Sequence, residues 1–327
     1  MKWKYALLAL LGLLILVPSV LYFGSLDWSR KHSHRVAALP IFNKNADSGE
    51  YRLKVGTDEF LVRVAGMQNN GPNVVLLHGF PESSIMWNRF AKKATQEGYR
   101  ILAFDQRGYS PGARPSNVAD YQINNLAKDV INIATEVGFD NFHLVGHDWG
   151  AVVGWKTVMD FPSRVLTWTA MSIPHPAVFL NGVLNDSIQK QRSSYFKLFQ
   201  RPIVPEFLLM YGNQKTYKKL METAPKENLD EYLSIVSEPG AFTAELNWYR
   251  ALDVEKLVAS KTLETNITTP TLFIWGKTDA VISLSIIPNQ QKYMKGSYKE
   301  LSLDTGHALI QNKENEVTEA VLAHFRQ

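Results

Sequence analysis

The chain contains no cysteine among its 327 residues. That absence excludes disulfide bonds, thiolate metal ligands and a cysteine nucleophile. A basic cluster with interleaved aromatic residues is also lacking, because the Lys and Arg residues behind the net charge of +4 are scattered along the chain. A nucleic-acid partner is therefore not expected. No pair of histidines has a spacing typical of metal ligands, so we expect no bound metal.

One long apolar run is present, at the N-terminus, from Tyr5 to Phe23 after Lys2 and Lys4. Basic residues followed by such a run are typical of a secretory signal peptide. The run also reaches the roughly 17–25 residues that a membrane-spanning helix needs. We expect residues 1–24 to be a single-pass anchor helix or a cleaved signal peptide, with a buried core helix as the third alternative. The leading charges favour a catalytic domain outside the cytosol, either membrane-anchored or exported.

Most of the remaining chain alternates short apolar runs with helical stretches such as residues 124–137. Runs that are apolar throughout and separated by helices indicate a parallel sheet covered on both faces. The clearest runs occupy residues 74–77, 101–104, 142–145, 165–171 and 272–275. The predicted fold class is therefore α/β, with a mostly parallel, doubly wound sheet.

This alternation fails between about Ile173 and Leu257, where aromatic and charged residues are frequent and strand-like runs are lacking. We interpret residues 173–258 as a helical cap inserted between two strands of the sheet. The core then comprises residues 46–172 and 259–327. The polar residues 25–45 are interpreted as a linker from the N-terminal segment.

The run at 142–145 continues into Gly-His-Asp-Trp-Gly at residues 146–150. Small residues on both sides of a central reactive residue are typical of a nucleophile elbow, a sharp turn from strand to helix that exposes the nucleophile above the sheet. The nucleophile here would be Asp148, and the backbone N–H of Trp149 would point towards the same space. Taken alone, the pattern also fits a turn in which Asp148 only caps the helix.

Three further residues favour the catalytic interpretation. Phe80 follows a buried strand within His-Gly-Phe-Pro, where its backbone N–H would be a second oxyanion donor. Asp279 follows the run at 272–275, and His307 follows a short predicted strand at 300–303. The order nucleophile, acid, base is one that triads on α/β sheets use. We therefore predict that His307 is a base oriented by Asp279. His78 and His147 flank the predicted site, and we expect them to hold loops by hydrogen bonds.

Residues 48–327 resemble the epoxide hydrolase branch of the α/β-hydrolase superfamily. The matching segments are HGFP at 78–81, DQRGYS at 105–110, GHDWG at 146–150, NWYR at 247–250 and TGH at 305–307. Enzymes of this family carry two cap tyrosines that donate hydrogen bonds to the epoxide oxygen. By position these resemble Tyr249 and Tyr195; the alternative for each is a tyrosine that merely packs within the cap.

The resemblance implies hydrolysis of a small apolar epoxide by water to a vicinal diol, without a cofactor. A phenol with an ordinary pKa of about 10 is protonated at neutral pH and can donate to a developing alkoxide. A carboxylate suits attack on an sp³ carbon, because the product is an ester. Water activated by His307 would then hydrolyse the Asp148 ester, while the N–H groups of Phe80 and Trp149 stabilise the oxyanion.

Two other functions remain open at this point. A haloalkane dehalogenase shares the aspartate nucleophile but needs a second halide-binding donor, and one common position for it holds the apolar Phe80. A catalytically silent, membrane-anchored binding module would not need Asp148, Asp279 and His307 together.

Overall fold

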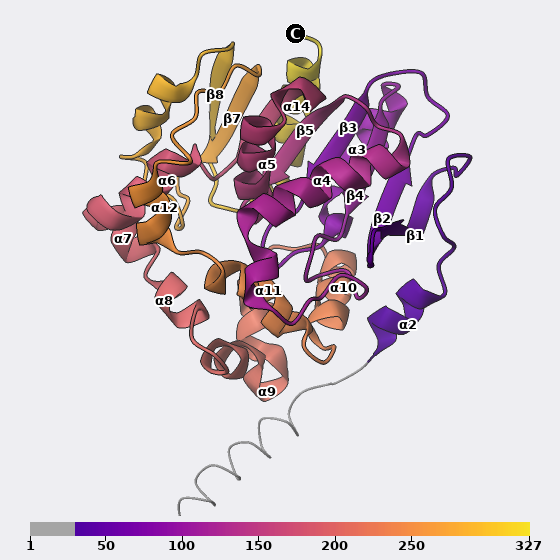
Figure 1. Cartoon of the computed structure of the whole chain (residues 1–327), viewed down its shortest axis with the longest axis horizontal. Coiled ribbons are helices and arrows are strands. Elements are labelled where there is room, and N and C mark those ends of the chain that lie inside the picture. The colour runs from indigo at the N-terminus through magenta and orange to yellow at the C-terminus, as the bar shows by residue number, and fades with distance from the viewer. Residues whose placement is uncertain (1–29) are drawn as a thin grey trace, which may run out of the picture.

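A computed structural model describes residues 30–327 of the chain. Its centre is an eight-stranded sheet with the order β1-β2-β4-β3-β5-β6-β7-β8 (Figure 1). All neighbours from β4 to β8 in this order are parallel, whereas β1 pairs antiparallel with β2 and β2 with β4. The mostly parallel α/β sheet predicted from the sequence is therefore confirmed. The strands are β1 (Gly49–Val55), β2 (Asp58–Ala65), β3 (Asn73–Leu77), β4 (Arg100–Phe104), β5 (Phe142–His147), β6 (Val165–Met171), β7 (Thr271–Gly276) and β8 (Tyr298–Leu303).

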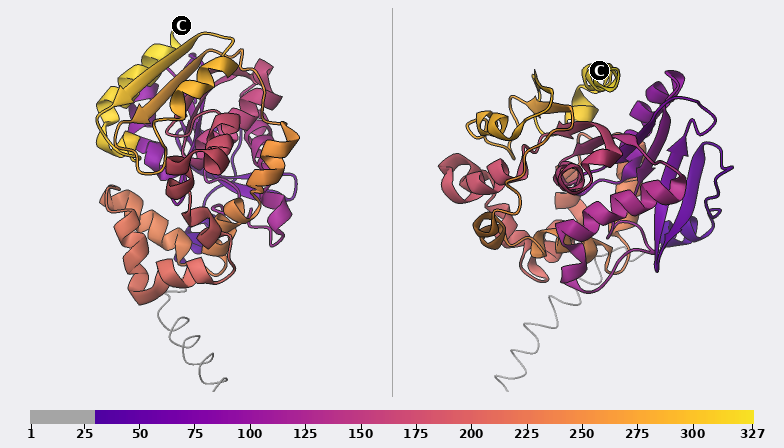
Figure 2. Two further views of the ribbon diagram at one scale, coloured as in Figure 1. Left: turned by 90° about the vertical axis from the view of Figure 1, so that its left-hand side faces the viewer. Right: turned by 45° about the horizontal axis from the view of Figure 1, so that its top comes forward.

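The central strands are buried on both faces, which explains why their sequences are apolar throughout. In β3, Val75 and Leu77 belong to the hydrophobic cluster on one face of the sheet, and Val74 and Leu76 belong to the cluster on the other. Helices cover both faces (Figures 1 and 2). The first face is covered by α4 (Ile123–Val137) and α5 (Trp149–Asp160), and the second by α3 (Asn88–Gln96), α13 (Leu309–Asn312) and α14 (Glu314–Phe325).

Between β6 and β7 the chain leaves the sheet and forms a series of helices that lie together at one end of the molecule (Figure 2). This cap covers the edge where the parallel strands end, which is where ligands bind in open α/β sheets. Its helices are α6 (Pro176–Asn185), α7 (Ser187–Arg192), α8 (Tyr195–Phe199), α9 (Val204–Leu220), α10 (Lys226–Val236), α11 (Ala241–Arg250) and α12 (Val254–Ser260).

The predicted anchor or signal segment, residues 1–24, lies outside the described residues. Within residues 30–327, no helix is both long enough and apolar enough to cross a membrane. The stretch predicted as a polar linker differs from that expectation, because it contains helix α2 (Lys31–Ala37) with His32 buried. Two polar contacts attach the helix: the Ser33 N–H donates to Glu238, which follows α10, and Arg35 pairs with Glu50.

Candidate active site

Asp148 occupies the turn between β5 and α5, with φ at 52°. A left-handed φ is strained for a residue other than glycine, and such strain is typical of functional turns. Two glycines allow this turn. A Cβ atom on Gly146 would lie 2.4 Å from the backbone oxygen of Gly150, and one on Gly150 would lie 2.3 Å from that of Leu77. The turn therefore has the geometry of a nucleophile elbow, with the carboxylate presented beyond the end of β5.

His307 lies between two carboxylates. Its Nδ1 is 2.8 Å from Oδ2 of Asp279, and its Nε2 is 3.3 Å from Oδ2 of Asp148. The other oxygen of Asp279 accepts hydrogen bonds from the backbone N–H groups of Val281, at 2.7 Å, and Ile282, at 3.1 Å. These bonds fix the Asp279 carboxylate and hence the orientation of the imidazole. The structure thus brings together Asp148, Asp279 and His307, as the sequence predicted, although Asp148 and His307 are 159 positions apart in the chain.

The charges of these groups support one another. Burial disfavours the imidazolium of His307, but Asp279 and Asp148 outweigh it and raise the pKa of His307 well above its ordinary value. Burial also disfavours both carboxylates, yet His307 lowers the pKa of Asp148 and of Asp279 below the ordinary range. The two carboxylates therefore favour the imidazolium form of His307 in the resting site.

The backbone N–H of Phe80 donates to Oδ1 of Asp148 at 2.8 Å. The loop that carries it is held by the buried His78, whose Nε2 accepts from the N–H of Gln106 at 3.0 Å. Nδ1 of His78 consequently carries the proton and donates to the Gly79 oxygen at 2.9 Å. Burial lowers the pKa of His78, in agreement with a neutral ring. The loop-holding role expected for His78 is confirmed by these bonds.

A second support beside the site was only partly expected from the sequence. Nε2 of His147 donates to the backbone oxygen of His307 at 2.9 Å, and its Nδ1 is 3.2 Å from Oε2 of Glu82. Gln311 donates to the other Glu82 oxygen. His147 was expected to hold a loop, whereas Glu82 was not predicted. Its position directly after the His-Gly-Phe-Pro segment was the available signal.

The cap brings Tyr195 on α8 and Tyr249 on α11 to the site, with their ring centroids 6.0 Å apart. The Tyr249 ring packs edge-on against Trp149, at 5.0 Å, and against Phe80, at 5.2 Å. Burial raises the pKa of Tyr249 well above its ordinary value, and neighbouring Tyr195 and Asp148 add to the rise. Burial and Asp148 likewise raise the pKa of Tyr195. Both phenols therefore stay protonated and can donate hydrogen bonds beside Asp148.

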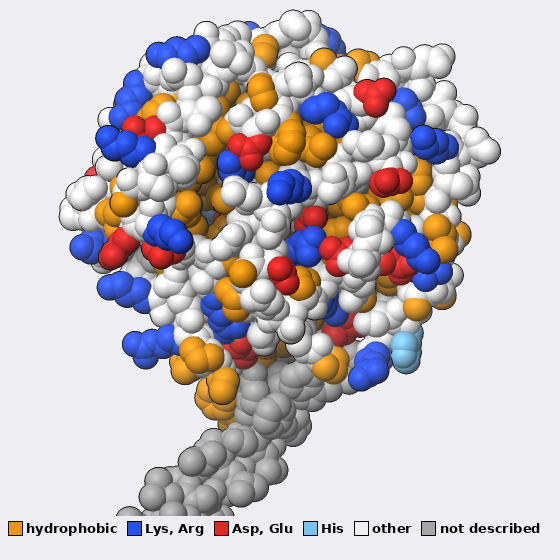
Figure 3. Space-filling view, viewed as in Figure 1, with side chains coloured by type: hydrophobic (Ala, Val, Ile, Leu, Met, Phe, Trp, Pro, Cys, Tyr) orange, Lys and Arg blue, Asp and Glu red, His pale blue; other side chains and the backbone are white. Residues whose placement is uncertain are grey.

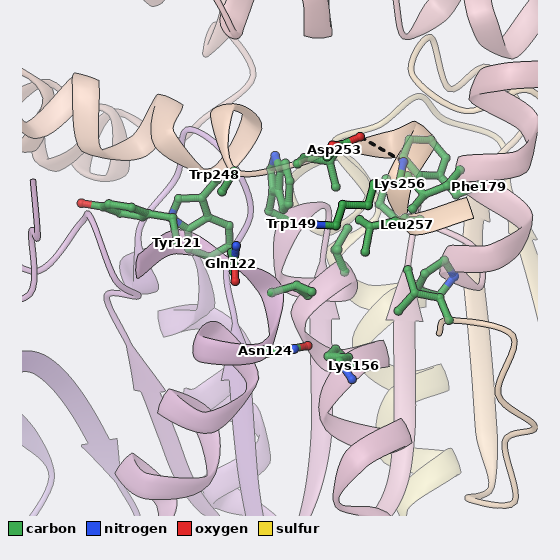
Figure 4. Close-up of a pocket in the computed structure, with 18 of the residues that line it drawn as sticks. Tyr121, Gln122, Asn124, Trp149, Lys156, Phe179, Trp248, Asp253, Lys256 and Leu257 are labelled. Carbon is green, nitrogen blue, oxygen red and sulfur yellow. Dashed lines mark hydrogen bonds between the residues drawn. The ribbon is translucent and has the colours of Figure 1, made fainter. Parts of the chain in front are cut away.

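A cavity of about 570 Å³ opens next to these groups and includes Asp148 and Tyr195 in its wall. This volume lies within the ~300–1,000 Å³ of typical small-molecule sites. Its buried part is lined mainly by apolar side chains, among them Trp149, Phe179 and Trp248 (Figure 4). Among residues 30–327, no group of three or more His, Asp or Glu side chains is arranged to hold a metal ion.

A protein-family model described as the alpha/beta hydrolase fold matches residues 72–313. The chain belongs to the α/β-hydrolase fold family. This α/β hydrolase is 31% identical to Epoxide hydrolase 3 of Xenopus tropicalis over 84% of its own length and 76% of the relative's. It is 30% identical to Epoxide hydrolase A of Mycobacterium tuberculosis, over 82% of its own length and 95% of the relative's.

A solved structure gives the same result. The crystal structure of Epoxide Hydrolase A from Mycobacterium thermoresistibile superposes on the hydrolase with a TM-score of 0.73 and 25% identity. The superposition covers 85% of this chain and 98% of the other. The hydrolase therefore lies in the epoxide hydrolase branch of its family, and the resemblance stated from the sequence is confirmed.

Proposed function

We propose that the protein is an epoxide hydrolase that opens an apolar epoxide to a vicinal diol through an ester on Asp148. The observation that carries the proposal is the arrangement of His307 between Asp279 and Asp148, with two protonated tyrosines beside the same carboxylate. The names of the relatives support the same reaction class. Neither metal nor cofactor takes part in the steps described below.

In the first step, a carboxylate oxygen of Asp148 attacks a ring carbon of the epoxide, and the carbon–oxygen bond of the ring breaks. The electron pair of that bond goes to the ring oxygen, which becomes an alkoxide. Tyr195 and Tyr249 donate hydrogen bonds to this oxygen as its charge develops. One phenol transfers its proton to the oxygen, which gives the first hydroxyl group, and the proton of the His307 imidazolium restores that phenol, so that His307 becomes neutral. The burial that raises the pKa of both phenols keeps their protons available for this purpose.

Hydrolysis of the ester follows from the change in charge. Once Asp148 is esterified it is neutral, so one of the two carboxylates that raise the pKa of His307 is lost. The imidazole, which lost its proton in the first step, accepts one from a water molecule, and the oxygen of that water attacks the Asp148 carbonyl carbon. The N–H of Phe80, already 2.8 Å from the carboxyl oxygen, stabilises the oxyanion, and the N–H of Trp149, the residue after the nucleophile, is the second donor of this proposal. Collapse releases the diol and restores Asp148.

The lining of the cavity supports an apolar substrate. Apolar and aromatic side chains form its buried part, and burying such a substituent contributes roughly 25 cal/mol per Å² of apolar surface. The apolar side chains would bind the substituent of the substrate, while Asp148 and Tyr195 in the cavity wall contact its epoxide ring.

The test is to add styrene oxide to the His307→Gln variant and record its intact mass. We expect a covalent adduct with the mass of the epoxide, because alkylation needs Asp148 but hydrolysis needs His307. The same experiment on Asp148→Asn should give no adduct, and the wild type should form diol. Diol formation by both variants would contradict the mechanism. Halide release from a panel of haloalkanes, without turnover of epoxides, would identify a dehalogenase instead.

A further inference from the structure

Helix α9 of the cap is two helical segments joined by a kink at residues 211–214, where the backbone leaves helical φ and ψ. Its first segment has apolar side chains on its solvent face as well as on its buried face. Val204, Leu208 and Tyr211 recur at the spacing of one helical stripe, and they are 40%, 47% and 48% exposed. Ile203, directly before the helix, is 71% exposed, although Met210 on the opposite face is buried. Figure 3 shows hydrophobic side chains at the lower end of the molecule, where α9 lies in Figure 1. Surface helices normally present polar residues to water, so an exposed apolar stripe of this kind indicates an interaction surface.

The charged residues next to this stripe in the sequence are almost all basic, with two before it and three in the segment that follows the kink. Between residues 195 and 220 the basic residues are Lys197, Arg201, Lys215, Lys218 and Lys219. The single acidic residue in that range, Glu206, is buried and pairs with Arg250 at 2.7 Å. Within the described part of the chain, none of these basic side chains forms an ion pair. The next acidic residue, Glu222, follows the end of α9. An apolar stripe with a basic surround is typical of helices that lie in the interface of a membrane.

The described chain begins on the same side of the molecule. Helix α2 lies at the cap end, in the lower part of both Figure 1 and the left view of Figure 2, and Arg35 on it donates to Glu231 of α10 at 3.2 Å. In the sequence, the apolar run ends at Phe23, which is 30 − 23 = 7 residues before Arg30. Seven extended residues span at most about 25 Å. The described chain therefore begins at the cap end of the molecule, a short stretch of sequence after the apolar run.

We propose that the α9 surface, made of Ile203, Val204, Leu208 and Tyr211 with the basic residues named above, docks on a lipid membrane that contains anionic headgroups. The apolar stripe enters the region between headgroups and acyl chains, and the lysines and Arg201 contact the anionic headgroups. This docking does not depend on the proposed reaction. It would place the cap, and with it the cavity, beside a medium in which apolar compounds dissolve.

The absence of cysteine makes a direct test possible. The full chain carrying Leu208→Cys is labelled with an environment-sensitive fluorophore and mixed with phosphatidylcholine vesicles, with or without phosphatidylglycerol. Leu166→Cys is the matched control, since Leu166 on β6 is a leucine of similar exposure, 43%, outside the cap. We expect the probe at 208 to shift to the blue and to be quenched by spin-labelled lipid in the anionic vesicles, while the probe at 166 is unchanged.

Charge-removing variants test the electrostatic part. Each of Lys215→Gln, Lys218→Gln and Lys219→Gln should lower the docked population about five-fold, which corresponds to about 1 kcal/mol per charge near an anionic surface. Retention of the native melting transition in every variant shows that loss of docking is not unfolding. A probe at 208 that stays in water with all vesicles overturns the proposal. A probe at 208 that is shielded from water in the absence of lipid also overturns it. Shielding that depends on protein concentration would identify a second copy as the occupant, and shielding that does not would identify the chain's own N-terminal segment.

Discussion

At the scale of single residues, the site alternates charge along a short line from Asp279 through His307 to Asp148. The strained φ of Asp148, which costs of the order of 1–3 kcal/mol, is maintained because the packed turn around it admits only glycine at the neighbouring positions. The carboxylate is held by the Phe80 N–H and by His307, so it faces the substrate with one defined geometry. The tyrosines complete the site from the cap side.

The two tyrosines can be separated from ordinary cap packing by removing their hydroxyl groups. Tyr249→Phe and Tyr195→Phe should each slow alkylation of Asp148 by about 10²-fold, the effect of removing one donor to a developing oxyanion. Single-turnover measurements of ester formation check this. Tyr232→Phe is the control, because Tyr232 on α10 is a buried cap tyrosine whose acidic neighbours are Glu82 and Glu231 and not Asp148. Unchanged alkylation in both variants would reduce the tyrosines to packing residues.

The pH dependence of stability tests the charge arrangement. The folded pKa of His307 is raised above the roughly 6.5 of an unfolded chain. The imidazolium therefore contributes stability that is fully present below about pH 6.5 and is lost as pH rises through the folded value. We expect the melting temperature of His307→Gln to fall below that of the wild type by more at about pH 6 than at about pH 10.

The exposed His34 on α2 provides the comparison for this experiment, because His34→Gln removes an imidazole that lies far from both carboxylates in the sequence and outside the cavity. Its melting temperature should follow that of the wild type across the same range. A difference between His307→Gln and the wild type that grows with pH would have the wrong sign for a raised pKa.

At the scale of helices and strands, the central strands were predictable because both of their faces are buried and their sequences are apolar throughout. Strands β1 and β2 were not singled out, because charged residues such as Arg52, Lys54 and Arg63 interrupt their apolar pattern. Helix α2 was missed for a related reason: its polar groups are satisfied by distant residues such as Glu238, which no local pattern reveals. The triad could be predicted because each member follows a recognisable strand, whereas Glu82 acts through a contact 65 residues away.

The junction of β3 and α5 depends on Gly150. A Cβ atom there would lie 2.3 Å from the backbone oxygen of Leu77, and backbone atoms cannot rotate away as a side chain can. Gly150→Ala should therefore push α5 from the sheet, cost about 1–3 kcal/mol of stability and lower kcat by displacing Asp148. Chemical denaturation and turnover of an epoxide measure the two effects. Gly306→Ala, where the nearest atom is 3.7 Å away, should be close to neutral although it adjoins His307.

At the scale of the whole molecule, the cap and core are joined by buried ion pairs between residues that do not line the cavity. Arg63 on β2 donates to Glu231 on α10 at 2.6 Å, and Arg114 of the core pairs with Glu238 at 2.5 Å. Glu231 also accepts from the Ser83 hydroxyl at 2.6 Å, three residues beyond Phe80 in the oxyanion loop. The position of the cap is thus linked to the loop that contacts Asp148.

Removing the charge of Glu231 tests that link. Glu231→Gln leaves the buried Arg63 without its closest cap carboxylate, and breaking a buried pair costs about 3–5 kcal/mol. We expect a lower free energy of unfolding and, because Ser83 loses a charged acceptor, a lower kcat as well. Asp230→Asn controls for position, since Asp230 is the exposed neighbour on α10 and has no ion pair within residues 30–327. A displaced Phe80 N–H would change the rate of Asp148 alkylation directly. Loss of stability with unchanged kcat would therefore mean that these ion pairs hold the cap on the core but do not affect the position of the Phe80 loop.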